Sequence, residues 1–165
     1  MAENEDLRFP EDFLKIEEIY LWDSKFERHA DYQPAVHDGK VHVQSKRGFE
    51  AEVLKAEAAD GETDELFRVK VSLGIRAVTS GDEEEPLHSV EATFAVEYRI
   101  TAPLPDAEMP DFIMFNSAHN VWPFWREHVY TTLQSASLPV LHIPFFSGSK
   151  KKDAGKGKRQ VAKKP

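Results

Sequence analysis

The chain has 165 residues, of which 41% are hydrophobic and 11% aromatic, enough to form the core of one ordinary domain. It contains no cysteine, which excludes disulfides, thiolate nucleophiles and cysteine-based zinc sites. There is no run of eighteen apolar residues, and the acidic start does not resemble a secretory signal. These features predict a soluble protein of a reducing compartment, with the cytoplasm as the default location.

The net charge of −8 is distributed unevenly. Residues 150–165 contain eight Lys or Arg and one Asp, so they carry +7, and the remaining 149 residues therefore carry −15. We expect a disordered acidic lead at residues 1–12, one domain at 13–146 and a disordered basic tail at 147–165. An acidic body repels nucleic acid and anionic membranes, so only the tail is expected to bind either of them.

The first predicted element spans residues 13–26, which are rich in β-branched and aromatic side chains. Its alternation slips at Glu17-Glu18, which indicates a strand with a bulge, and a helix is the competing interpretation. The sequence is loop-like from Asp31 through Gly39. Weak alternation at 41–43 and 49–56 then predicts one further strand.

Two longer runs alternate between apolar residues and residues that are mostly polar. Phe67–Ala77 and Val90–Ile100 each place six residues on one face, and the acidic segment 80–86 between them is typical of a hairpin turn. Opposite charges meet if Arg76 lies across from Glu91 and Lys70 across from Glu97. We therefore expect an antiparallel pair in this register, with one buried face.

Three prolines between 101 and 110 predict a loop that leaves the sheet, followed by a short helical turn at 111–115. A helix is expected from Val121 to Ala136, with Asn120 as N-cap and Pro123 in the first turn. Residues 138–146 form an extended apolar strip that must lie against another surface.

Sequence motifs of catalysis are absent from the whole chain: there is no glycine-rich nucleotide loop, nucleophile elbow or metalloprotease helix. The seven histidines are scattered, with no two at helical i, i+4 spacing, so we expect no metal site. Acidic neighbours such as Glu17-Glu18 are typical of a solvated surface. We expect no enzyme activity, no catalytic residues and no cofactor.

Aromatic residues are dense between positions 112 and 146. A helix offers only one stripe to a sheet, and Trp122 and Trp125 share a face from which Phe124 and Tyr130 diverge. The excess indicates an oligomer interface or an apolar binding groove.

The order of these elements, together with three short motifs, resembles the SecB family of export chaperones. The helix start Trp122-Pro-Phe-Trp-Arg-Glu127 is similar to the family's aromatic-Pro-Tyr-x-Arg-Glu pattern. The strip Leu138-Pro-Val-Leu-His-Ile-Pro144 is similar to its Phe-Pro-x-Leu-x-Leu-x-Pro pattern, and Ile19–Glu27 resembles its first strand. Ser135-Ala136-Ser137 replaces the family's usual glycine, and the tail is lysine-rich where many members have an acidic one.

The resemblance implies an α+β fold, with a four-stranded antiparallel sheet and helices packed on one face. It further implies assembly as a dimer of dimers, a homotetramer formed through helix and edge-strand contacts. Such a chaperone is a holdase, which binds unfolded polypeptides, here preproteins, through apolar grooves and delivers them to the SecA motor. The groove candidates are Phe112, Phe115, Trp122 and Phe145. The resemblance places an acidic SecA-binding surface on Asp23, Glu27 and Glu91.

Three alternatives remain open. The chain could be a SecB-like chaperone that guards an unstable antitoxin instead of serving general export. It could be an adaptor that binds nucleic acid or membrane through the Lys150–Lys164 tail, although no aromatic residue interleaves that tail. It could also be a binder of small molecules, with an apolar pocket under the crossing loop.

Overall fold

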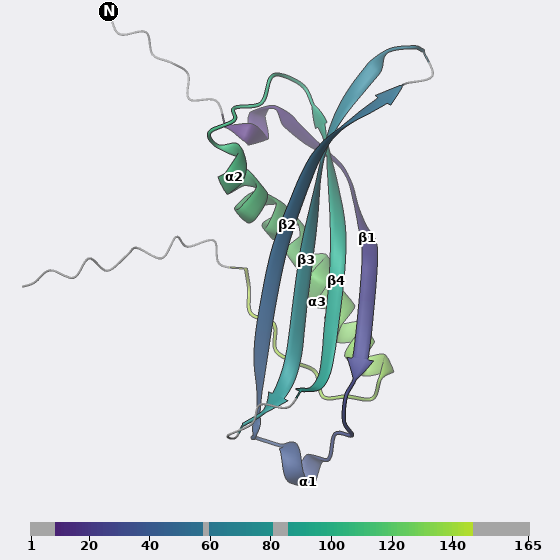
Figure 1. Ribbon diagram of the computed structural model, residues 1–165, viewed down its shortest axis with the longest axis vertical. Coiled ribbons are helices and arrows are strands. Elements are labelled where there is room, and N and C mark those ends of the chain that lie inside the picture. The colour runs from purple at the N-terminus through teal and green to yellow at the C-terminus, as the bar shows by residue number, and fades with distance from the viewer. Residues whose placement is uncertain (1–8, 58–59, 81–85, 147–165) are drawn as a thin grey trace, which may run out of the picture.

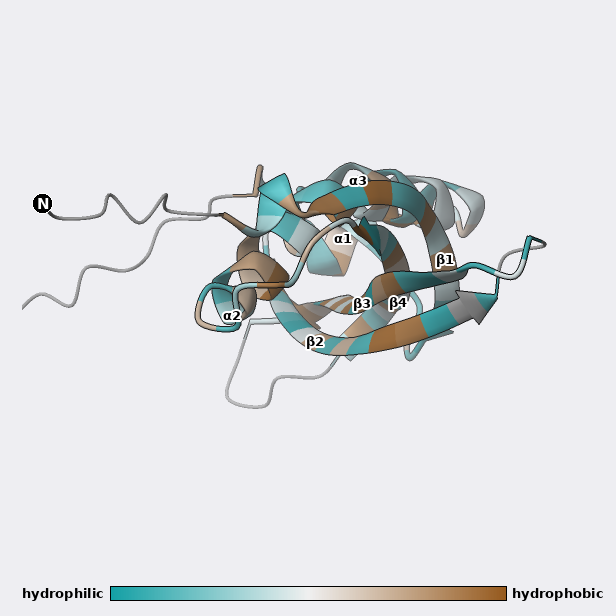
Figure 2. Cartoon of the chain, turned by 90° about the horizontal axis from the view of Figure 1, so that it is seen from above, coloured by the Kyte–Doolittle hydropathy of each residue, from teal (hydrophilic) through white to brown (hydrophobic). Residues whose placement is uncertain are grey.

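The computed structural model describes residues 9–57, 60–80 and 86–146, and the expected acidic lead (in part) and basic tail lie outside these ranges. Four strands form one antiparallel sheet in the order β1-β4-β3-β2, and helices cover one of its faces (Figures 1 and 2). The strands are β1 Leu14–Arg28, β2 Val41–Glu57, β3 Thr63–Thr79 and β4 Pro86–Ile100. The predicted α+β architecture is therefore confirmed.

Short helical turns flank the first strand. The 3-10 turn η1 (Pro10–Asp12) precedes β1, and α1 (Pro34–His37) interrupts the segment that was expected to be a loop through Gly39. In α1, Pro34 occupies a first-turn position, where its missing N–H costs little.

The two central strands form the floor of the core. Their alternating residues, such as Val69, Val71 and Val96, are fully buried on the face that the helices cover. Strict alternation places every second side chain on that face, which is why the sequence predicts these strands well.

The first strand is irregular, as the slip in its alternation predicted. Its pairing with β4 shifts between Ile16 and Glu18, and again between Leu21 and Asp23. The second shift leaves Trp22 as an extra residue in the strand. The two edges of the sheet therefore differ, because β2 pairs with β3 without a shift along its whole length.

The predicted register of the β3–β4 hairpin was wrong by two residues. Glu91 lies opposite Gly74 instead of Arg76, and Glu97 lies opposite Arg68 instead of Lys70. A displacement of two keeps every side chain on its expected face, so alternation cannot distinguish the two registers. The observed register also avoids the juxtaposition of two arginines that the expected one required, since Arg68 now meets Glu97.

A single helical segment follows the crossing loop. It comprises α2 (Met109–Asp111), the π-helical stretch η2 (Phe112–Ser117) and α3 (Ala118–Ser135). The expected helix start at Asn120 was wrong, because this residue lies inside α3 and its side-chain amide donates to the Tyr98 hydroxyl at 2.9 Å. Pro123 is likewise inside the helix, where it cannot donate to the carbonyl of His119.

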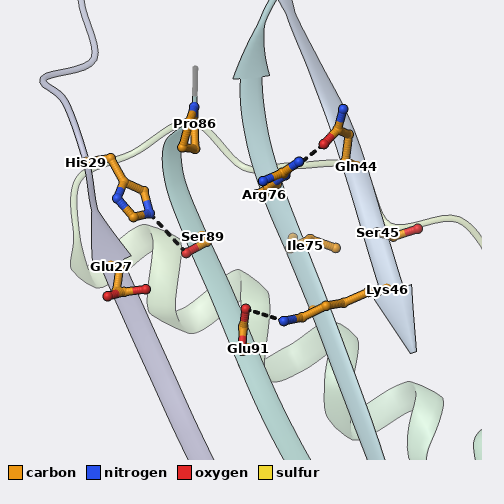
Figure 3. A pocket seen from close by; sticks show the side chains of 11 residues that line it. Glu27, His29, Gln44, Ser45, Lys46, Ile75, Arg76, Pro86, Ser89 and Glu91 are labelled. Atoms are coloured by element: carbon orange, nitrogen blue, oxygen red, sulfur yellow. Dashed lines mark hydrogen bonds and ion pairs between the residues drawn. The ribbon is translucent and has the colours of Figure 1, made fainter. Parts of the chain in front are cut away.

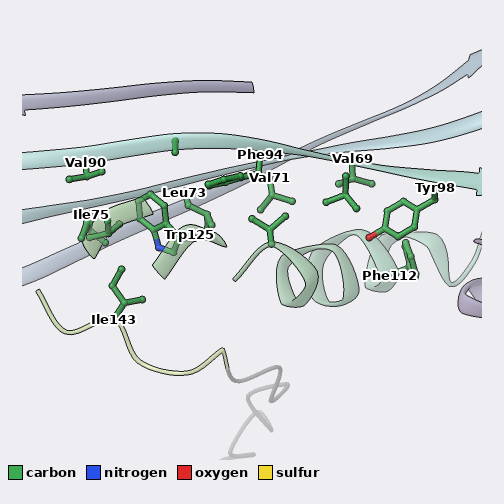
Figure 4. Close-up of a cluster of buried hydrophobic side chains, with 14 of the residues drawn as sticks. Val69, Val71, Leu73, Ile75, Val90, Phe94, Tyr98, Phe112, Trp125 and Ile143 are labelled. Carbon is green, nitrogen blue, oxygen red and sulfur yellow. The ribbon is translucent and has the colours of Figure 1, made fainter. Parts of the chain in front are cut away.

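The helix packs on the sheet through one stripe of side chains, of which Val121, Trp125 and Leu133 are almost fully buried. Figure 4 shows Trp125 of this stripe among the buried side chains of the sheet. After α3 the chain runs back toward β2 as an extended strip, residues 138–146, which lacks regular secondary structure (Figure 1). Leu138 and Ile143 of this strip are buried, so the expected surface beneath it exists.

In the described part of the chain, no helix is both long enough and apolar enough to span a lipid bilayer.

Candidate functional site

An apolar groove opens on the helical side of the sheet, between the β2 edge, α3 and the C-terminal strip. Its cavity volume is about 440 Å³. Leu73 and Ile75 form the sheet side, and Trp122 and Trp125 come from α3. The remaining lining residues belong to β2 and its neighbour β3 (Val43, Ser45, Lys46, Arg47, Gly74) and to the strip (His142, Ile143, Pro144).

The groove has a firm base because its largest side chain is locked in the core. Trp125 is only 1% exposed, and Figure 4 shows it among Leu73, Ile75 and Ile143. Trp122, three residues before Trp125 in the same helix, is half-buried. It donates its indole N–H to the Pro144 carbonyl at 2.9 Å. This hydrogen bond fixes the strip against α3 and thereby sets the position of one groove wall.

The four groove candidates from the sequence do not lie together. Trp122 lines the groove. Phe145 comes directly after the groove-lining Pro144 in the strip and is 81% exposed, and the Arg126 guanidinium carbon lies 4.9 Å from its ring centre. Phe112 lies in the core at the other end of the helical segment, 4% exposed and edge-to-face with Tyr98. Phe115 is half-buried in η2 and does not line the groove.

Sequence reasoning missed the wall that β2 contributes. Val43 and Arg47 point to the helical side of the sheet, in register with Ala77 and Leu73 of β3. Val43 is 41% exposed, which is unusual for a valine facing the helical layer. The only sequence signal was the short alternation at 41–43, which could not show that this edge is left uncovered.

The three acids assigned to a partner gather on the opposite, outer face of the sheet. Asp23 lines one shallow depression of about 350 Å³. Glu27 lines a neighbouring one of about 390 Å³ (Figure 3), and Glu91 lines both. Thr93, Ser72 and Gly74 leave the surface low between these acids.

Lysines neutralise two of these acids. The Lys46 side chain reaches from β2 across Gly74, and its Nζ lies 2.6 Å from the Glu91 Oε1. The Lys25 Nζ lies 3.0 Å from the Glu27 Oε1. The hydrogen bond from Lys25 lowers the pKa of Glu27. A Cβ on Gly74 would lie 2.8 Å from the Lys46 Cε, so the missing side chain is what lets the lysine cross the strand. The expected pairing of Glu91 with Arg76 is absent, and Arg76 donates to Gln44 at 2.7 Å.

The far end of the outer face carries a denser charge network. Arg68 contacts Glu97 at 2.7 Å, and the Tyr20 hydroxyl donates to the same carboxylate at 2.9 Å. Burial, followed by the hydrogen bond to Glu97, raises the pKa of Tyr20. The Lys70 ammonium lies 4.2 Å from the centre of the Trp22 ring. The outer face is therefore a surface of paired charges more than a uniformly acidic one.

Two histidines, one buried and one partly buried, lie where β1 and β4 meet the last turns of α3. His88 is fully buried, and neither ring nitrogen has a hydrogen-bond partner. Burial lowers its pKa, with the charge of Arg28 as the second cause. A 2.9 Å hydrogen bond joins the His128 Nε2 to the Ser24 hydroxyl. Partial burial lowers the pKa of His128 as well. Within the described ranges, no group of three His, Asp or Glu side chains could hold a metal ion.

Comparison with known proteins identifies the fold. No family model and no curated protein sequence matches the chain. Among solved structures, the chain is similar to the SecB-like chaperone Rv1957 of Mycobacterium tuberculosis, in complex with a ChAD peptide from the antitoxin HigA1 (Rv1956). The TM-score is 0.62 at 19% sequence identity, and the match covers 83% of this chain and 93% of that one. This chain therefore has a SecB-like fold, as its sequence motifs predicted.

Proposed function

We propose that this chain is a non-enzymatic chaperone that binds unfolded polypeptide segments in the groove between β2, α3 and the C-terminal strip. The groove is the observation that carries the proposal, because it joins aromatic and aliphatic side chains into an accessible surface on a SecB-like fold. Capture of exposed apolar segments needs a surface of this kind and no reactive group.

Within this proposal, Trp122 and Phe145 contact clients, since one lines the groove and the other is exposed beside it. Phe112 is buried and supports the core. Phe115 is half-buried and lies outside the groove, so we assign it no contact with clients. Val43 and Arg47 join the client site from β2, where sequence reasoning placed no residue.

The experiment compares two exposed valines. Val43→Asp places a charge in the groove, whereas Val36→Asp places the same charge at a similarly exposed position of α1 (41% and 49% exposed). We expect the first variant to lose binding to permanently unfolded, carboxymethylated α-lactalbumin and to stop suppressing aggregation, and the second to retain both. Equal activity of the two variants would exclude this groove as the client site.

Assembly as a homotetramer and residence in the cytoplasm are part of the same proposal. Exposed apolar residues on the helical side of edge strand β1, such as Ile16 and Leu21, support a further contact between copies. Multi-angle light scattering measures the native mass. A monomer that fails to suppress aggregation would remove both the assembly and the chaperone assignment.

Delivery of preproteins to SecA is one candidate destination. It is supported by the gathering of Asp23, Glu27 and Glu91 on one face, where basic peptides would be attracted. We expect Asp23→Lys with Glu91→Lys to abolish SecA binding and to leave client binding intact. Glu11→Lys with Asp106→Lys changes the net charge equally at distant positions and serves as the control. Unchanged SecA affinity in the first variant, measured by calorimetry at two salt concentrations, would exclude this surface.

Guarding an antitoxin is the second candidate. The likeness to Rv1957 favours it, because that chaperone is seen with an antitoxin peptide. The pairing of Glu27 and Glu91 with lysines also reduces the charge available to a basic motor domain. Co-purification of the chain with one defined small protein, at stoichiometric yield, would support a dedicated client over general export.

A further inference from the structure

Phe146 is surrounded by groups from two other elements. Its ring centre lies 5.3 Å from that of Trp122 and 6.2 Å from that of His119, both on α3. The Arg47 guanidinium carbon of β2 lies 6.0 Å from the same ring centre. An aromatic ring, an imidazole and a guanidinium thus converge on one phenyl ring, which is an arrangement that favours aromatic side chains over aliphatic ones.

The neighbouring phenylalanine has a different environment. Phe145 is 81% exposed, and the Arg126 guanidinium carbon, which lies 4.9 Å from its ring centre, belongs to a residue that does not line the groove. Phe146, in contrast, is partly buried, although it is the last described residue of the strip. Two adjacent residues of the same type thus differ in burial, because only Phe146 packs against Arg47, His119 and Trp122. We call the site that these three side chains form the seat of Phe146.

The seat is continuous with the groove. Trp122 and Arg47 both line the groove and both contact Phe146, so the phenyl ring stands at the groove's end. Upstream, the strip is held independently of Phe146 by the buried Ile143 and by the indole hydrogen bond to Pro144. Phe146 could therefore leave the seat while the groove wall stays in place.

We propose that the seat formed by Arg47, His119 and Trp122 is an aromatic subsite of the client groove, and that Phe146 fills it when no client is bound. A client segment with a phenylalanine, tyrosine or tryptophan displaces Phe146 and takes its contacts. The strip thus contains its own competitor, which lowers the affinity for client segments that enter the seat, and most strongly for segments with an aromatic residue. This inference rests on the proposed client function of the groove.

The test uses two fluorescein-labelled extended peptides that differ only in one central residue, phenylalanine or leucine. Phe146→Ala empties the seat, and Phe124→Ala is the control, because Phe124 is an exposed phenylalanine of α3 that does not line the groove. We expect Phe146→Ala to bind the phenylalanine peptide about two- to tenfold more tightly than wild type, the range that loss of one aromatic pair gives. The gain for the leucine peptide should be smaller, and Phe124→Ala should leave the affinity for both peptides unchanged.

Equal or weaker binding of the phenylalanine peptide by Phe146→Ala would show that Phe146 is a wall of the groove, and the inference would be wrong. Phe146→Leu, which keeps an apolar side chain of similar length, should give an intermediate gain and protects the test if the alanine variant is unstable. Failure of wild type and all variants to bind either peptide would remove the proposed function itself, which separates the two conclusions.

Discussion

Replacement of Trp125 by alanine tests whether the groove rests on the core as described. The indole is 1% exposed and packs among Leu73, Ile75 and Ile143. Burial of an aromatic side chain of about 200 Å² is worth about 5 kcal/mol at 25 cal/mol per Å². Measured losses for Trp→Ala in protein cores are about 3 to 5 kcal/mol, and we expect a value in this range.

The free energy of unfolding is obtained from urea titration followed by circular dichroism, because the variant removes one of the fluorescent residues. Trp122→Ala is the control, since its indole is half-buried and should cost less. A loss below about 1 kcal/mol for Trp125→Ala, with unchanged native mass, would contradict the burial of this side chain and the description of the groove floor.

Three further predictions concern the rest of the chain. Deletion of 150–165 should leave the melting temperature and native mass unchanged, because Val161 and scattered alanines are the only apolar residues of that segment. Burial lowers the pKa of His88 and of His128 below the ordinary 6.5, so stability is fully present above that pH and should fall as pH drops through and below 6.5, as urea midpoints at pH 7.5 and 5.5 would show. Arg28→Met should destabilise by about 1 kcal/mol, since the Arg28 side chain donates to the Ala136 carbonyl at the end of α3 at 2.6 Å, and thermal unfolding would measure the loss.

The sheet could be predicted from sequence where one face is buried and the other is not. Val69 lies between Arg68 and Lys70 because the helices cover only one side of the sheet. The slip at Glu17-Glu18 corresponds to an extra residue in β1. The hairpin register could not be predicted in the same way. Registers two residues apart bury the same face, and the pairing shift near Val78 has no signature in the alternation.

The helix and the site were predicted less completely. Proline is most common in a first turn, so Pro123 indicated a helix start that in fact lies well upstream. The sequence named Trp122 as a candidate for the client groove, and in the structure its side chain lines the apolar groove, while its role in client binding stays a prediction. The contribution of Val43 depends on which strand forms the uncovered edge, and that follows from the strand order, which local pattern does not determine.

The π-helical stretch Phe112–Ser117 also constrains the number of residues in the helical segment. A π turn closes its hydrogen bond over one residue more than an α turn does. The stretch η2 therefore acts as a single-residue insertion in an otherwise α-helical segment. Removing one residue there would let α-helical hydrogen bonding resume and would rotate everything before it by about 100° around the axis. Phe112 would then turn away from Tyr98 while Trp125 stayed on the sheet. At this point in the chain, a substitution is therefore easier to accommodate than a change in the number of residues.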